Sequence, residues 1–114
     1  RSKKTIRPGH FYLLVEIDRK QSTEAYQLKS IVDGALTKTF GKAGAAEPVD
    51  ILKVVDNLAY LRIHANAYTI VTSALSLTHT FEGSPCSLRV IKASPFLSSL
   101  AVPRFLPLAT YEVL

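Results

Sequence analysis

The side chains best suited to chemistry are three histidines and one cysteine: His10, His64, His79 and Cys86. The histidines fall at a predicted strand start, a strand end and a helix end, and none has a carboxylate at metal-ligand spacing. The chain also lacks a glycine-rich phosphate loop and a Gly-x-Ser-x-Gly nucleophile motif. A lone cysteine supplies neither an internal disulfide nor a several-cysteine zinc site, and Cys86 after Pro85 is typical of a small buried apolar residue. We therefore predict no catalytic residue, no metal site and no cofactor.

A second chemical feature is a basic arm over residues 1–9, which contains Arg1, Lys3, Lys4 and Arg7. The whole chain has a formal net charge of +5, so much of its positive charge is concentrated in this arm. Clustered cations suit contact with RNA phosphates, and we predict these four residues as candidate RNA-binding residues. The alternative is a solvated terminus that binds nothing.

Length and composition limit the fold to one domain, because 114 residues with 47% hydrophobic residues provide for a single core. No window approaches the about 20 predominantly apolar residues that cross a bilayer, so we expect no membrane partner. We expect one folded domain over residues 10–97 and a tail over residues 98–114.

Period-two alternation predicts the strands of this domain. In residues 10–17 every second side chain is apolar, and those between them are both apolar and polar. This alternation predicts a first strand with one face in the core. Residues 49–64 form a predicted hairpin that turns at Asp56-Asn57, since both residue types tolerate positive φ. Residues 86–94 form the predicted last strand, with Leu88 and Val90 facing inward.

Two helices are predicted between the strands. Apolar residues at intervals of three and four predict a helix that begins after a cap at Ser22 or Thr23 and ends at Gly41. Its inward positions are Leu28, Ile31, Val32, Ala35, Leu36 and Phe40. A second helix is predicted from Asn66 or Ala67 to Thr80, with Tyr68, Val71, Ala74 or Thr78, and Leu75 inward.

The order of these elements predicts an α+β, ferredoxin-like (split β-α-β, RRM-like) two-layer sandwich. Its four-stranded antiparallel sheet has the order 4-1-3-2, with both helices on one face. An RNA-recognition domain acting alone is one alternative, although residues 57–63 lack the glycine of the RNA-recognition octapeptide. An acylphosphatase-like enzyme is a remote alternative, because residues 18–21 lack the glycines of a phosphate loop.

The opposite face of the sheet carries aromatic and apolar side chains beside cations, a composition typical of protein interfaces. We predict a partner interface formed by Tyr12, Leu14, Tyr60, Arg62, His64, Arg89, Ile91 and Phe96. The alternative is that the tail, from Phe105 to Val113, folds back and covers this face.

The segment from Gly83 to Leu97, GSPCSLRVIKASPFL, resembles the last strand and following Ser-Pro-Phe-Leu turn of a small protein subunit of eukaryotic ribonuclease P and RNase MRP. It is similar to the Rpp-fourteen and Pop-eight branch of the Pop-five family. Leu61-Arg62-Ile63 and the helix after it are similar too, so the resemblance covers roughly residues 11–97, while residues 98–114 match no family pattern.

The resemblance implies a non-catalytic subunit that braces the catalytic RNA for tRNA 5′-leader removal and rRNA processing. It implies a hetero-oligomer in the nucleus and nucleolus. The implied partners are a paralogous Pop-family subunit, a TIM-barrel-like ribonuclease P subunit and the ribonuclease P or MRP RNA, whose direct contact with this chain is left open.

Overall fold

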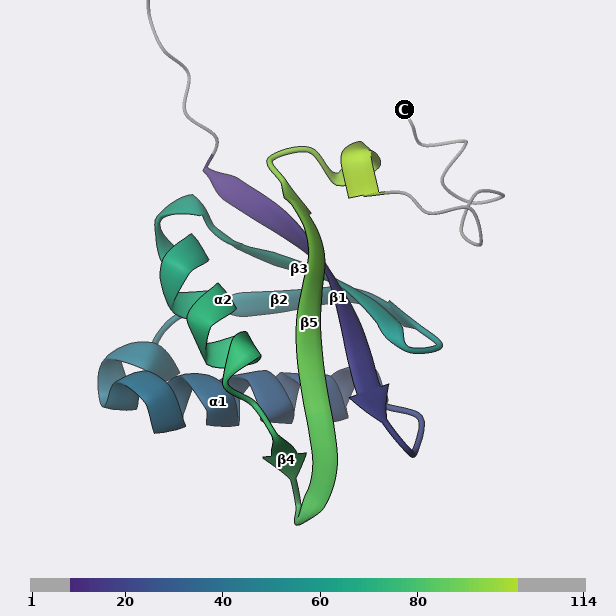
Figure 1. Cartoon of the computed structure of the whole chain (residues 1–114). Coiled ribbons are helices and arrows are strands. Elements are labelled where there is room, and N and C mark those ends of the chain that lie inside the picture. Colours follow the sequence, from purple (N-terminus) through teal and green to yellow (C-terminus); the bar gives the residue numbers. More distant parts are fainter. Residues whose placement is uncertain (1–8, 101–114) are drawn as a thin grey trace, which may run out of the picture.

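A computed structural model of the chain describes residues 9–100. The elements in chain order are β1 (His10–Arg19), α1 (Ala25–Ala45), β2 (Val49–Val55), β3 (Leu58–His64), the 3-10 turn η1 (Ala65–Ala67), α2 (Tyr68–Ser76), β4 (Thr80–Phe81), β5 (Ser84–Ser94) and the 3-10 turn η2 (Leu97–Leu100). The strands form an antiparallel sheet in the order β2-β3-β1-β5-β4, and both helices lie on one face of it (Figure 1). The predicted α+β two-layer architecture is therefore confirmed.

The sheet has five strands, whereas the sequence predicted four. The four longer strands follow the predicted order, which is compatible with a ferredoxin-like arrangement. The added strand β4 consists of two residues and pairs with the start of β5. The turn between them is made by Glu82 and Gly83, which have φ values of 52° and 80°, a backbone twist that suits a tight hairpin.

The second helix is shorter than predicted: it ends at Ser76 and not at Thr80. Thr80 belongs instead to β4 of this small hairpin. Threonines have low helix propensity, and Thr78 donates its hydroxyl to the carbonyl oxygen of Ala74 at 3.1 Å, which satisfies a group at the helix end. Val71, Ala74 and Leu75 are buried as predicted, while Tyr68, which was predicted inward, is 39% exposed at the first turn.

The N-cap of helix α1 is Glu24, whereas Ser22 or Thr23 was predicted, so the helix begins at least one residue later than predicted. The backbone N–H of Glu24 donates to Oε1 of Gln27 at 2.9 Å, an arrangement called a capping box. The hydroxyl of Thr23 instead accepts a hydrogen bond from Nη1 of Arg19 at 3.2 Å. The alternative caps are therefore not used: the Thr23 side chain joins the loop to β1.

The far end of α1 is kinked at Gly41, which has a φ of 66° and ψ of −145°. Gly41 ends the regular helix as predicted, and a further helical turn then runs to Ala45. In that turn Gly44 packs against Leu36 and Phe40. Phe40 was predicted to be buried but is 39% exposed, and the residue packed beside it, Gly44, has no side chain to cover it.

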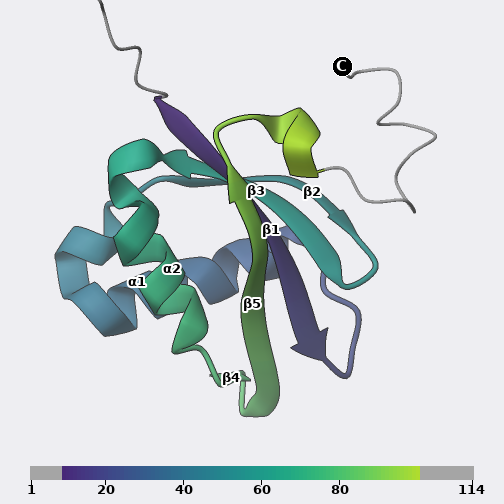
Figure 2. The same ribbon diagram turned by 45° about the horizontal axis from the view of Figure 1, so that its top comes forward.

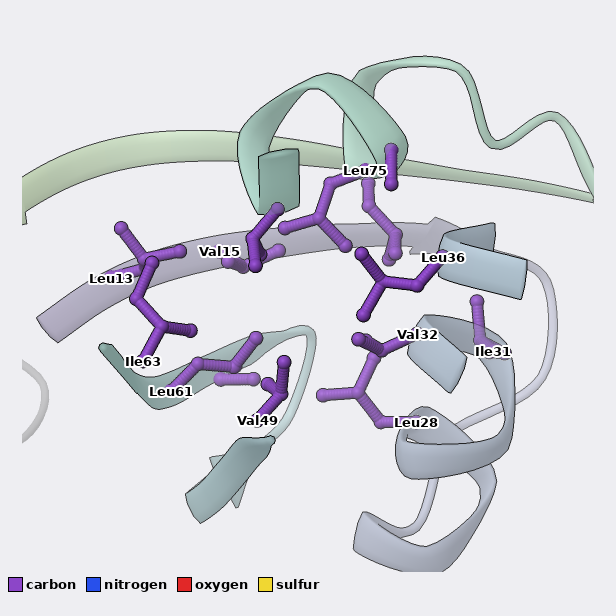
Figure 3. Packing of buried hydrophobic residues seen from close by; sticks show 14 of the residues in the cluster. Leu13, Val15, Leu28, Ile31, Val32, Leu36, Val49, Leu61, Ile63 and Leu75 are labelled. Carbon is purple, nitrogen blue, oxygen red and sulfur yellow. The ribbon is translucent and has the colours of Figure 1, made fainter. Parts of the chain in front are cut away.

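The main core lies between the helices and the sheet. Alternate residues of β1 and β3, including Leu13, Val15, Leu61 and Ile63, point toward the buried side chains of α1 and α2 (Figure 3). Ile31, Leu36 and Leu61, whose exposure would have contradicted the predicted fold, are all buried. The apolar alternation in the sequence therefore identified the core face of the sheet correctly.

A β-bulge shifts the pairing of β1 with β5. Val15 pairs with Val90, whereas Leu14 pairs with Lys92, so Ile91 is an extra residue in β5. Lys92, and not Ile91, therefore lies opposite Leu14. Simple alternation along residues 86–94 did not predict this change.

Candidate protein interface

The outer face, defined here as the sheet face away from α1 and α2, is built mainly from β1 and β3. These strands pair so that Leu14 is opposite Tyr60, Tyr12 is opposite Arg62, and His10 is opposite His64. The predicted sharing of one face by Tyr12, Tyr60, Arg62 and His64 is confirmed by this register.

Part of this face is closed by the chain itself. Leu100 of η2 forms a second apolar cluster with Leu14, Leu58 and Tyr60, and the Tyr60 hydroxyl donates to the carbonyl oxygen of Leu100 at 2.9 Å. η2 lies on the side of the sheet opposite the helices (Figures 1 and 2). Leu14 is 1% exposed and Tyr60 is 9% exposed, so the prediction that these two side chains lie open to a partner is corrected.

The turn that brings η2 onto the sheet begins at the end of β5. The backbone N–H of Phe96 donates to the hydroxyl of Ser94 at 3.0 Å, which reverses the chain around Pro95. The alternative cover, Phe105 to Val113, lies outside the described residues. The segment that covers this part of the outer face in the structure is η2, residues 97–100, which comes earlier in the chain.

Both arginines of the predicted interface are paired with carboxylates on the sheet. Nη2 of Arg62 lies 2.8 Å from Oδ2 of Asp50, and the Asp50 carboxylate raises the pKa of the Arg62 guanidinium, chiefly through this hydrogen bond. Arg89 forms an ion pair with Glu16, with its Nε 3.1 Å from the carboxylate. These exposed pairs stabilise the fold little, but they leave the outer face less basic than the sequence indicated.

A short stretch at the end of β5 supplies three exposed apolar side chains near this face. Ile91, Phe96 and Leu97 are 40%, 67% and 43% exposed, and we call them the β5–η2 apolar surface. Ile91 and Phe96 were predicted interface residues, whereas Leu97 was missed. Its signal was its position in the Ser-Pro-Phe-Leu turn, where two large apolar side chains follow a strand end. Tyr12 is half-buried at the edge of the second cluster, and His64 is exposed.

The outer face does not form the base-stacking platform of an RNA-recognition domain. Such a platform needs exposed aromatic rings on the two middle strands. Here the ring of Tyr60 on β3 is buried under η2, and Tyr12 on β1 is only half-exposed. The alternative of an RNA-recognition domain that acts alone is therefore disfavoured.

The loop after β1 is also unsuited to phosphate binding of the acylphosphatase kind. Arg19, the last residue of β1 before this loop, has its guanidinium carbon 5.1 Å from the ring centre of Phe81 and donates a hydrogen bond to Thr23. Arg19 thus joins β1, the loop and β4 in a cation–π and hydrogen-bonded contact. We conclude that Arg19 contributes to the packing of the fold.

His10 and His64 lie at a strand start and a strand end, as predicted. His10 and His64 are not separated, since they face each other across β1 and β3 with ring centres 5.1 Å apart. His79 is exposed after α2, and Cys86 is buried in the core, where burial raises the pKa of its thiol. Within residues 9–100, no group of three or more His, Cys, Asp or Glu side chains is placed to hold a metal ion. None of the described helices is long and apolar enough to span a membrane.

Comparison with known proteins identifies relatives of the chain. It is 38% identical over 77 residues to ribonuclease P protein subunit p14 of Mus musculus, a match that covers 66% of this chain and 63% of that protein. The human protein of the same name is 37% identical over 79 residues, with coverages of 68% and 64%. The chain therefore matches less than two thirds of the length of these relatives.

A solved structure and a family model complete the comparison. A chain in a cryo-EM structure of yeast ribonuclease MRP has a TM-score of 0.78 and 21% sequence identity, and the match covers 88% of this chain and 84% of that chain. This likeness shows a shared fold. The family model described as ribonucleases P/MRP protein subunit Pop8 matches residues 10–94, from the start of β1 to the end of β5. The chain belongs to this Pop8 family of ribonuclease P and MRP protein subunits.

Proposed function

We propose that this chain is a non-catalytic protein subunit of a ribonuclease P or RNase MRP ribonucleoprotein. In this role it braces the catalytic RNA through protein partners during removal of tRNA 5′ leaders and processing of rRNA, in the nucleus and nucleolus. The family match over residues 10–94 is the observation that carries this proposal.

The proposed partners are a paralogous Pop-family subunit and a TIM-barrel-like subunit, in a hetero-oligomer. The β5–η2 apolar surface supports protein contact, because Ile91, Phe96 and Leu97 expose large apolar areas within seven consecutive residues. Aromatic residues that become buried at the centre of an interface commonly provide much of the binding free energy. Phe96, at 67% exposure, is the best placed anchor of the three.

We expect the double variant Phe96→Ala, Leu97→Ala to bind the paralogous subunit about 30-fold more weakly, equal to about 2 kcal/mol. Both side chains are already exposed, so their removal should leave the core unchanged. Binding of the full chain to the purified paralogous subunit is measured by isothermal titration calorimetry. Recovery of ribonuclease P or MRP RNA with the tagged chain provides a second measurement in cells.

Tyr26→Ala is the matched control for this experiment, because Tyr26 is 72% exposed on α1, away from η2. The control should bind like the unmodified chain. Normal affinity of the double variant would reject the β5–η2 apolar surface as the interface. Failure of the unmodified chain to recover either RNA would reject the proposed function itself.

The basic arm is the proposed contribution to RNA contact. The four cations of the arm lie outside the described residues: Arg1, Lys3, Lys4 and Arg7. Their importance follows from the net charge of the described part of the chain. Residues 9–100 contain nine Lys and Arg against eight Asp and Glu, so the folded part is nearly neutral. Any strong electrostatic attraction of this chain to RNA therefore depends on the arm.

We expect replacement of these four residues by alanine to weaken RNA binding and to flatten its salt dependence. The slope of log K against log salt should fall by roughly 0.7 to 0.9 for each phosphate that the arm no longer neutralises. Filter binding of the assembled particle's RNA over a salt series measures the slope. Alanine at Lys38 and Lys42, two exposed α1 cations, is the control. A slope that does not change when the arm is neutralised would assign those residues to solubility.

A further inference from the structure

The cross-strand histidine pair is the feature that the proposed function does not use. His10 is the first residue of β1 and His64 is the last residue of β3, and the antiparallel register places them directly opposite each other. Both side chains are exposed, and their rings are 5.1 Å apart between centres with 35° between their planes. The two strands are held together beside the pair by a backbone bond from the N–H of Ala65 to the carbonyl oxygen of Gly9, at 3.0 Å.

This separation suits two imidazoles that share one metal ion. In a tetrahedral site, zinc lies about 2.0 to 2.1 Å from each ligating nitrogen, which places the centres of two ligating rings about 5 Å apart. The observed distance between the ring centres has this value, so the spacing of the two rings is compatible with one shared ion. Imidazole nitrogen is a preferred ligand of Zn²⁺, Cu²⁺ and Ni²⁺ and a poor ligand of Mg²⁺ and Ca²⁺.

We propose that His10 and His64 together form a two-histidine binding site for a divalent transition metal ion, Zn²⁺ above all. With two protein ligands, the ion keeps two positions of a tetrahedron for water or for an oxygen ligand from another molecule. The site joins the first residue of β1 to the last residue of β3. Metal binding therefore stabilises the pairing of these strands where the basic arm enters the domain.

Among residues 9–100, the positive charge nearest the pair on the outer face is largely compensated. Arg62, the nearest cation on the same face of β3, is paired with the Asp50 carboxylate, so its charge is largely compensated. Tyr12 lies opposite Arg62 and adds no positive charge. The other described residues with a nitrogen or sulfur ligand do not offer a second metal site of this kind. Cys86 is buried in the core, and His79 follows α2 without a second histidine beside it.

Calorimetric titration of ZnCl₂ into the untagged, metal-free full chain tests the proposal. We expect saturable binding of one ion per chain, and a rise in the thermal unfolding midpoint when Zn²⁺ is added. His10→Phe and His64→Phe should each abolish both effects. Phenylalanine keeps an aromatic ring against the remaining histidine while it removes the ligand nitrogen, so the strand pairing is retained. Circular dichroism of each variant verifies that it is folded.

His79→Phe is the matched control, because it removes a histidine outside the pair and should leave Zn²⁺ binding unchanged. Absence of saturable binding by the unmodified chain would overturn the proposal, since the ring contact would then be packing alone. Binding that survives both His10→Phe and His64→Phe would also overturn it. One ion per two chains would assign the metal to a contact between copies and likewise reject the site proposed here.

Discussion

Replacing Leu61 by alanine is expected to lower the free energy of unfolding by about 2 to 5 kcal/mol. Leu61 is fully buried near the middle of β3, where it lies between its strand neighbours Leu13 on β1 and Ile51 on β2. Its side chain belongs to the cluster that joins the sheet to both helices (Figure 3). Truncation there removes buried apolar area and leaves a cavity that the strands on either side prevent from closing.

Urea denaturation followed by circular dichroism measures this change in stability, and Leu77→Ala is the control. Leu77 is 59% exposed after α2, so its truncation should change stability by no more than about 0.5 kcal/mol. A total stability of about 5 to 15 kcal/mol is usual for a small domain, so the effect at Leu61 is large on that scale. A change at Leu61 no larger than the change at Leu77 would contradict the assigned core.

The second large effect is expected at Gly44, in the helical turn beyond the Gly41 kink. A Cβ atom added at Gly44 would lie 2.2 Å from the carbonyl oxygen of Leu36 and 2.9 Å from Cβ of Phe40. The first of these neighbours is backbone, so the turn has to move away from the end of α1 to relieve the clash. We expect Gly44→Ala to destabilise the domain by about 1 to 3 kcal/mol, as overpacked core substitutions do.

Gly34→Ala is a control within the same helix, because a Cβ at Gly34 meets nothing within 4 Å. There the ordinary helix preference for alanine should apply and stabilise the chain by about 1 kcal/mol. The two glycine-to-alanine substitutions are thus expected to have opposite signs in the same urea experiment. Stabilisation by Gly44→Ala would show that the turn after Gly41 does not pack against Leu36.

The sequence was sufficient to predict the elements whose burial has a regular period. The alternation in residues 10–17 and 58–64 identified the core faces of β1 and β3, and the spacing of Leu28, Ile31 and Leu36 identified the core face of α1. Strand order followed from the succession of elements, because few topologies connect them without crossing. The turn at Asp56-Asn57 was predicted from residue type, and Asp56 has a φ of 56°.

Other features depend on the register between distant segments, which the sequence does not encode locally. The burial of Leu14 and Tyr60 depends on Leu100, which lies 40 residues beyond Tyr60. The contact of His10 with His64 depends on how β1 and β3 are aligned, since a shift of one residue would place the rings on opposite faces. The extra residue at Ile91 and the short strand β4 likewise arise from pairing, and period-two alternation does not reveal them.

The central place of β1 also has a consequence for synthesis of the chain. β1 is made first among the strands, yet it pairs on one side with β3 and on the other with β5, as far along the chain as Ser94. Its ion pair from Glu16 to Arg89 spans 73 residues. Contacts of this separation slow folding, because the intervening chain has to be closed before they form.

During translation, β1, α1 and the hairpin of β2 and β3 emerge before any residue of β5. The nascent domain therefore exposes one edge of β1, with unpaired backbone N–H and C=O groups, until residue 94 has left the ribosome. A transcript that ends before β5 would produce a sheet open at its middle strand, with the core residues Cys86 and Leu88 missing. The interval before β5 appears is therefore the one in which the unpaired edge of β1 is open to pairing with strands of other chains.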